Sequence, residues 1–94
     1  MSINKIMEAV QIATGIKPTE LIGLSRKRNI AYARHLFCKA SRVSGYTLEF
    51  IGANILRDHS TVAASIKVAE DFIVLYPFFK KQYKSIMTEI GLPC

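Results

Sequence analysis

The chain has 94 residues, 50% of them hydrophobic and 21% charged, with a formal net charge of +6 and a pI of about 9.6. This balance predicts one small folded domain spanning residues 1–94 and excludes a disordered tail. The longest apolar runs, such as FIVLY at 72–76, are too short to cross a bilayer, and no signal-peptide pattern opens the chain. We therefore expect a cytoplasmic protein that does not contact membranes.

The cysteine pattern argues against a metal site. Cys38 and Cys94 are far apart, whereas a zinc site needs close pairs of Cys or His. Two free thiols in a reducing compartment are the simpler interpretation. We expect no metal, no cofactor and no small-molecule substrate.

Helical periodicity begins at the N-terminus. Ser2 precedes a predicted helix that stops at Gly15, and Pro18 then opens a short helix that Gly23 ends. The apolar stripe of the first helix recurs at three- and four-residue steps. It consists of Ile3, Ile6, Met7, Val10 and Ala13.

A basic segment follows. LSRKR at 24–28 is predicted to be a loop, and Asn29 is the expected cap of a helix with Ile30, Ala33, Phe37 and Ala40 on its inner face. No acid lies between Glu20 and Glu49. This segregation favours an anionic partner over a merely solvated face. The basic residues within the segment are Arg26, Lys27, Arg28, Arg34, Lys39 and Arg42.

The spacing after the turn at Gly45 predicts a helix-turn-helix at about 47–74. Thr47 caps a short helix over LEFIGAN, a brief turn follows around Leu56 and Arg57, and Asp58 caps a longer helix. Gly52 comes too early to be the glycine often found in such turns. The expected buried stripe of the longer helix is Val62, Ile66, Ala69 and Ile73.

Pro77 restarts the chain as a final helix that ends at Gly91. No segment alternates like a strand, so the predicted fold class is all-α. The inward residues of this last helix are predicted to be Phe79, Tyr83, Ile86 and Ile90.

The stretch ILRDHSTVAAS at 55–65 allows two interpretations, a hydrolase site or the tip of a DNA-reading helix. Neighbouring residues on a helix point about 100° apart, so Asp58, His59 and Ser60 do not form a catalytic relay among themselves. The only other histidine is His35, and TGIKPTE lacks the spacing of a phosphate-binding loop. We therefore predict that the protein is not an enzyme.

As a DNA reader, the same residues have plausible chemistry. Arg57 is suited to guanine or a phosphate, Asp58 to a cytosine amino group or to capping, and His59 to a base acceptor or a phosphate. Ser60 and Thr61 suit either, or belong to ordinary helix-start chemistry. Arg26 or Arg28 would enter the minor groove from the loop, while Lys80, Lys81 and Lys84 are taken as solvated surface.

The segment RDHSTV at 57–62 resembles the signature RDHTTV of the C-terminal DNA-binding domain of the bacterial replication initiator DnaA. ELIGLSRKRNIAYAR at 20–34 is similar to the family's acidic-Leu start, basic loop and Arg-bearing helix. TLEFIG at 47–52 is similar to the segment that the family writes as SLPEIG. The resemblance covers about residues 3–75, and the last helix matches only in kind.

The resemblance implies a bundle of about six helices containing a helix-turn-helix, of the DnaA C-terminal or Trp-repressor-like type. It implies sequence-specific binding of a box in double-stranded DNA, in replication initiation or its regulation. By position, Arg26 is similar to the family's minor-groove arginine, and Asp58, His59 and Ser60 to its base-reading residues. The candidate DNA-binding residues are Arg26, Lys27, Arg28, Arg34, Thr47, Arg57, Asp58, His59, Ser60 and Thr61.

The chain departs from the family pattern at several points. Leu24 and Ser25 stand where many members have polar or basic residues, and one residue is missing near Ala40. Leu56 stands where glycine is usual, in a turn one residue short, so a changed entry angle of the recognition helix is expected. Ser60 in place of threonine loses a methyl group. No ATPase domain precedes the domain, so the chain is expected either to be a fragment or not to assemble on DNA through ATP.

The competing hypothesis is a protein-interaction or dimerisation module that keeps the bundle without specific DNA binding. Its motivation is the aromatic-rich FIVLYPFF at 72–79, which would leave an apolar patch for a protein partner or a second copy. We favour the alternative that these residues belong to the core.

Overall fold

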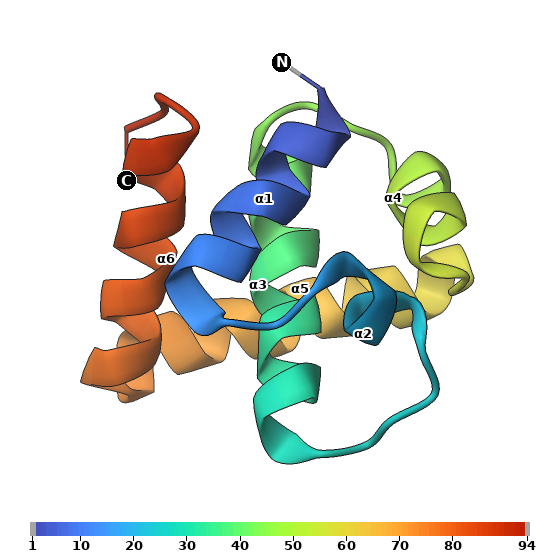
Figure 1. Cartoon of the computed structure of the whole chain (residues 1–94), viewed down its shortest axis with the longest axis horizontal. Coiled ribbons are helices and arrows are strands. Elements are labelled where there is room, and N and C mark those ends of the chain that lie inside the picture. Colours follow the sequence, from blue (N-terminus) through green and yellow to red (C-terminus); the bar gives the residue numbers. More distant parts are fainter. Residues whose placement is uncertain (1, 94) are drawn as a thin grey trace.

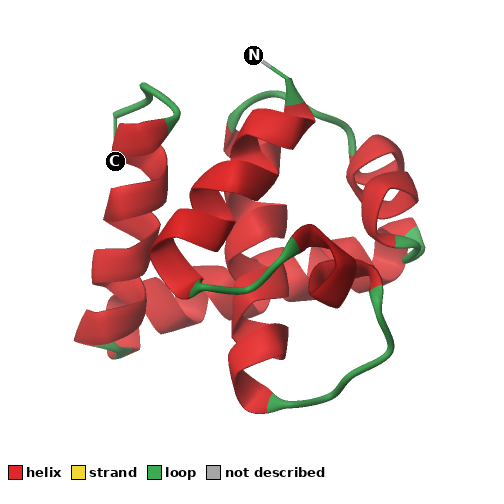
Figure 2. Ribbon diagram, viewed as in Figure 1, coloured by secondary structure: helices red, strands yellow, loops and turns green. Residues whose placement is uncertain are grey.

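The computed structural model describes residues 2–93. Over that range the chain forms six α-helices and no strand, so the predicted all-α fold is confirmed (Figures 1 and 2). The helices are α1 (Ile3–Thr14), α2 (Pro18–Ile22), α3 (Arg28–Val43), α4 (Leu48–Ile55), α5 (His59–Leu75) and α6 (Pro77–Glu89).

Helix α3 stands at the centre of the bundle and packs against each of the other five helices. In Figure 1, α5 crosses behind α3, α1 passes in front of α3, α6 lies on one side, and α2 and α4 lie on the other. The predicted inner face of α3 is buried completely or nearly so at Ile30, Ala33, Phe37 and Ala40. This central helix therefore connects the helix-turn-helix to the rest of the molecule.

Two of the predicted helix starts, those of α1 and α4, are capped by the side chains that the sequence predicted. The Ser2 hydroxyl accepts from the Lys5 backbone N–H at 3.3 Å, and the Thr47 hydroxyl accepts from the Phe50 N–H at 3.1 Å. Both bonds satisfy amides that have no carbonyl partner at a helix N-terminus. The starts of α1 and α4 are therefore fixed by local hydrogen bonds from residues that can be recognised in the sequence.

Helix α3 begins earlier than predicted. Its first residue is Arg28 and its N-terminal boundary is Lys27, so Asn29 is not the cap. The Lys27 carbonyl accepts from the Ala31 N–H at 2.9 Å, while the Lys27 N–H donates to the Ser25 hydroxyl at 3.3 Å. A helix start fixed mainly by backbone geometry carries no side-chain signature, which is why the prediction missed it.

The buried stripe of α5 also differs from the prediction. Val62 and Ala69 are buried, but Ile66 and Ile73 are only half-buried, and Ser65 takes a buried position. Because α5 crosses α3 (Figure 1), its buried residues lie between Val62 and Ala69, and its C-terminal part packs against α6 instead. The Ser65 hydroxyl is hydrogen-bonded to Nδ1 of His35 on α3.

The interpretation of FIVLYPFF as core holds at its ends and fails in the middle. Phe79 is buried, and the Phe72 ring packs edge-on against it with the ring centroids 5.4 Å apart. By contrast, Val74, Leu75 and Phe78 are 83%, 64% and 69% exposed. They lie at the end of α5 and the start of α6. None of the described helices is both long and apolar enough to cross a membrane.

Candidate nucleic-acid interface

The turn between α4 and α5 is tight because Gly52 allows the two helices to approach. A Cβ atom at Gly52 would lie 2.2 Å from the Arg57 carbonyl oxygen and 3.3 Å from the Val62 side chain. The Gly52 carbonyl accepts from the Arg57 N–H at 2.9 Å, which closes the turn. Gly52 is therefore the close-contact glycine of this helix-turn-helix, although its early position had suggested otherwise.

Leu56 takes the backbone conformation that glycine would adopt easily. Its φ of 56° and ψ of 47° are left-handed, and it is the one non-glycine residue with positive φ among residues 2–93. The side chain is 72% exposed, so little packing energy offsets this backbone conformation. The missing glycine of the turn is thus accommodated by local strain in the backbone.

The first turn of α5 presents its side chains to solvent. Asp58, His59, Ser60 and Thr61 are all exposed. The Asp58 carboxylate accepts from the Thr61 backbone N–H at 2.7 Å, and this bond, followed by one from the Thr61 side chain, lowers the pKa of Asp58. The ionised cap lies beside an exposed imidazole and an exposed hydroxyl.

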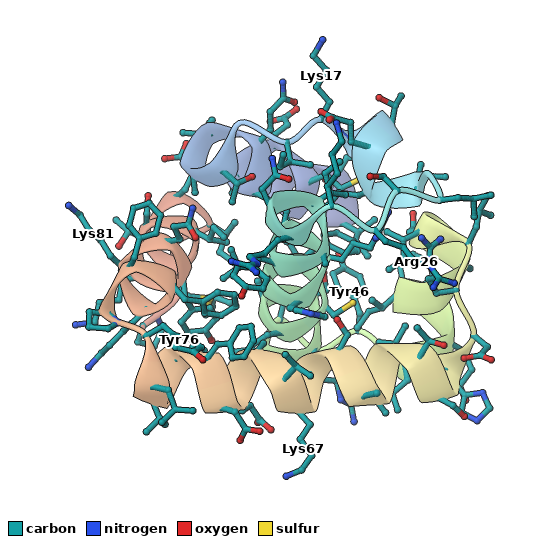
Figure 3. All side chains as sticks on the ribbon, turned by 90° about the horizontal axis from the view of Figure 1, so that it is seen from below. Lys17, Arg26, Tyr46, Lys67, Tyr76 and Lys81 are labelled. Carbon is teal, nitrogen blue, oxygen red and sulfur yellow. The ribbon has the colours of Figure 1, made fainter. Side chains whose placement is uncertain are left out.

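The basic loop lies on the same side of the molecule. Arg26, Lys27 and Arg28 are exposed, and Figure 3 shows Arg26 on the side where α5 begins, with Tyr76 and Lys81 on the opposite side. An open cleft of about 420 Å³ lies between the loop and the helix-turn-helix turn. The cleft is lined by Leu24, Ser25, Arg26, Arg34, Leu56 and Arg57.

Arg34 and Arg57 differ from the other candidates because they are half-buried and bonded to the protein itself. Nη2 of each guanidinium donates to the Gly23 carbonyl at 2.7 Å. Burial, followed by the neighbouring charge of Arg57, lowers the pKa of Arg34. Sequence reasoning had no means of finding these contacts, because their acceptors are backbone carbonyls.

The remaining candidate, Thr47, lies apart from this group. It is exposed and caps α4 at the end remote from the turn. Two further basic residues of the acid-free segment are engaged elsewhere: Lys39 Nζ pairs with Glu70 at 3.0 Å, and Arg42 Nη1 donates to the Tyr46 carbonyl at 2.9 Å. Arg26, Lys27 and Arg28 are therefore the three consecutive exposed basic residues of the segment, and Arg42 is exposed apart from them.

The buried polar groups near His35 form a packed contact between α3 and α5. Burial, followed by the charge of Arg34, lowers the pKa of His35, and burial raises the pKa of the Cys38 thiol to about 11. A neutral imidazole and a protonated thiol suit an interior packing role. Cys38 is a free cysteine, and Cys94 lies outside the described residues. Within residues 2–93, no three His, Cys, Asp or Glu side chains gather as a metal site would require.

Comparison with known proteins identifies the family. A search of curated proteins found no match to the chain. The family model for the bacterial DnaA protein helix-turn-helix matches residues 3–68, which include α1 to α4 and the first half of α5. That match covers more than half of the chain and contains both the basic loop and the turn described above. The chain therefore belongs to the bacterial DnaA helix-turn-helix family, a family of DNA-binding domains.

Proposed function

We propose that the chain binds specific sequences in double-stranded DNA, as in DnaA-box recognition during replication initiation or its regulation. One observation carries the proposal: the exposed Arg26 loop and the α4–α5 turn, which leads directly into the exposed first turn of α5, line a single cleft that contains three arginines. Along a duplex, a sugar–phosphate strand separates the major groove from the minor groove. The loop and the helix-turn-helix, on either side of a basic cleft, match this order: one element for each groove and the cleft for the strand between them.

In this arrangement the first turn of α5 enters the major groove. His59 donates to a base acceptor, and Asp58 accepts from a cytosine amino group. Ser60 and Thr61 bond to bases or phosphates, and the Thr61 methyl group contacts a thymine methyl.

The basic loop serves the neighbouring minor groove. Arg26 inserts there, where a narrow A·T-rich groove attracts a guanidinium. Lys27 and Arg28 neutralise phosphates, and Thr47 lies at the N-terminus of α4, an end of a helix that favours a phosphate.

The test is a fluorescence-anisotropy titration with a DnaA-box duplex and a scrambled duplex, each at two salt concentrations. We expect a preference for the box of order 10³ and a steep loss of affinity with added salt. Arg26→Ala and His59→Ala should each weaken box binding roughly ten- to hundredfold without changing the circular dichroism spectrum.

Lys81→Ala is the matched control for loss of charge, because Lys81 is exposed on the opposite side of the molecule (Figure 3). It should leave the box preference unchanged. Equal binding to both duplexes would contradict box recognition, and unchanged affinity of both site variants would show that the assigned residues are wrong.

A protein-interaction or dimerisation module is the second candidate, and one observation favours it. Val74, Leu75 and Phe78 form an exposed apolar corner at the end of α5 opposite the DNA-facing turn. A second copy docked there would leave the first turn of α5 free. Sedimentation velocity over a wide concentration range tests this, since a monomer at every concentration would contradict the dimer and Phe78→Ser should abolish any dimer seen.

A further inference from the structure

The C-terminal end of α2 is held by two arginines that come from other parts of the chain. A helix C-terminus leaves its last carbonyls without intrahelical partners and carries partial negative charge. At α2 those carbonyls point toward the Arg34 and Arg57 guanidinium groups. With only five residues, Pro18–Ile22, α2 has little stability of its own.

Arg34, from α3, binds along the chain where α2 passes into the basic loop. Its Nε donates to the Leu21 carbonyl at 2.8 Å, and its Nη1 donates to the Ser25 carbonyl at 2.8 Å. Its Nη2 bonds the Gly23 carbonyl at 2.7 Å and the Glu20 carbonyl at 3.3 Å. One planar fork thus fixes the path of the backbone immediately before Arg26.

Arg57, from the helix-turn-helix turn, reaches the same segment. Its Nη1 donates to the Ile55 carbonyl of its own turn at 2.8 Å and to the Ile22 carbonyl at 3.2 Å. Its Nη2 donates to the Gly23 carbonyl at 2.7 Å. Because the Gly23 carbonyl accepts from both arginines, the loop, α3 and the turn that precedes α5 are joined at one point.

We propose that Arg34 and Arg57 are positioning residues, an arginine clamp that sets the Arg26 loop relative to the first turn of α5. The proposal rests on the proposed function, because the two elements that the clamp connects are the two DNA-contacting ones. It gives these arginines a role in binding that does not require their guanidinium groups to touch a base. A lysine would keep the charge but not the planar fork that serves several carbonyls at once.

The experiment compares Arg34→Lys and Arg57→Lys with Arg42→Lys. Arg42 is the matched control because it lies on the same helix as Arg34 and donates to a carbonyl outside the clamp, that of Tyr46. Each clamp variant should weaken box binding about tenfold while its circular dichroism spectrum stays unchanged, and the control should do neither. Amide hydrogen exchange at Leu21 and Gly23 should accelerate at least tenfold in the clamp variants alone.

A double-mutant cycle separates positioning from direct contact. If the clamp positions the loop, Arg26→Ala should lose most of its effect on box affinity in the Arg34→Lys background, because the loop is already misplaced. Full additivity together with a shallower salt dependence would identify Arg34 as a phosphate contact and overturn the proposal. Unchanged exchange and unchanged affinity in both clamp variants would also overturn it.

Failure of the proposed function gives a different result. If the wild-type chain does not distinguish the box from the scrambled duplex, specific recognition fails, and with it the role of the clamp in DNA binding. The exchange measurement still decides whether the clamp orders the loop: faster exchange at Leu21 and Gly23 supports that part, and unchanged exchange contradicts it.

Discussion

The candidate interface consists of two regions with the same kinds of side chain in opposite environments. The reading surface, defined here as Arg26, Lys27, Arg28 and residues 58–61, is exposed. The arginine clamp behind it is half-buried and bonded to backbone carbonyls. Arg26 and Arg57 both line the same cleft, yet only Arg57 is fixed by the protein. Residue type alone therefore does not separate the arginine that we propose to contact DNA from one that supports the fold.

This comparison has an energetic consequence. Changes in the supporting region, defined here as the arginine clamp and the α4–α5 turn with Gly52, should lower the free energy of unfolding. They remove hydrogen bonds or introduce clashes in packed backbone. Changes on the reading surface should alter affinity for DNA and leave folding almost untouched. The strongest way to break this distinction is to disturb the turn on which both regions depend.

Gly52→Ala should have the largest effect on stability. The added Cβ would meet the Arg57 carbonyl oxygen at 2.2 Å, so α4 and the turn would have to separate. We expect the free energy of unfolding to fall by about 3 kcal/mol, measured by chemical denaturation. Gly23→Ala is the control, since its Cβ would approach the Thr19 carbonyl oxygen no closer than 3.4 Å. If the Gly52→Ala variant is as stable as the Gly23→Ala variant, the close approach of Gly52 to the Arg57 carbonyl is contradicted.

Asp58→Asn sharpens the comparison within a single residue, because Asp58 belongs to the reading surface and also caps α5. Asparagine caps a helix start as well as aspartate does, so the thermal unfolding midpoint should hardly move. An amide that replaces the carboxylate weakens acceptance from cytosine, so box affinity should fall roughly tenfold. Anisotropy titration and thermal melting measure the two effects separately. Unchanged affinity would restrict Asp58 to capping.

A large part of the fold is predictable because its signals are local. Three helices begin after a capping side chain, that of Ser2, Thr47 or Asp58. Helix α1 ends at Gly15, whose φ is 77°, and α6 begins at Pro77. Each of these residues acts on backbone groups within a few positions of itself. Periodicity then predicts which faces are buried, and it succeeds for α3, whose neighbours surround it.

The remaining features depend on contacts between distant parts of the chain. The role of Gly52 follows from the close approach of Arg57 and Val62, and the clamp follows from carbonyls of residues 20–25. No pattern along the sequence marks a backbone carbonyl as an acceptor for an arginine nine or more positions away. The exposure of Val74 and Leu75 likewise reflects where the crossing of α5 over α3 ends, not their hydrophobicity.

The contact between His35 of α3 and Ser65 of α5 leads us to expect that stability depends on pH. The lowered pKa of His35 means that the folded protein resists protonation of this imidazole more than the unfolded chain does. The unfolded state therefore binds more protons below the ordinary pKa of 6.5, and stability is full above that pH and falls as the pH decreases toward the lower folded-state pKa. Denaturation between pH 8 and 5 should show this loss, with a slope of at most about 1.4 kcal/mol per pH unit.

His35→Gln removes the titrating group and should flatten this profile between pH 7 and 5. His59→Gln is the matched control, because His59 is exposed on the reading surface and should leave the wild-type profile in place. If His59→Gln flattens the profile and His35→Gln does not, the pH dependence of stability arises at the candidate interface and not at the contact between α3 and α5.

Leu56→Gly should have the smallest effect, and its sign is informative. Leu56 has φ at 56° and is 72% exposed, so its replacement relieves left-handed strain while it removes almost no packing. The greater freedom of glycine in the unfolded chain offsets part of this gain, so we expect stabilisation below about 1 kcal/mol. Chemical denaturation measures it, with Leu24→Gly as the control because Leu24 is an exposed leucine of the same cleft without positive φ. If Leu56→Gly destabilises the chain, the leucine side chain contributes an interaction that outweighs the strain of its backbone, and the turn depends on this residue and not only on Gly52.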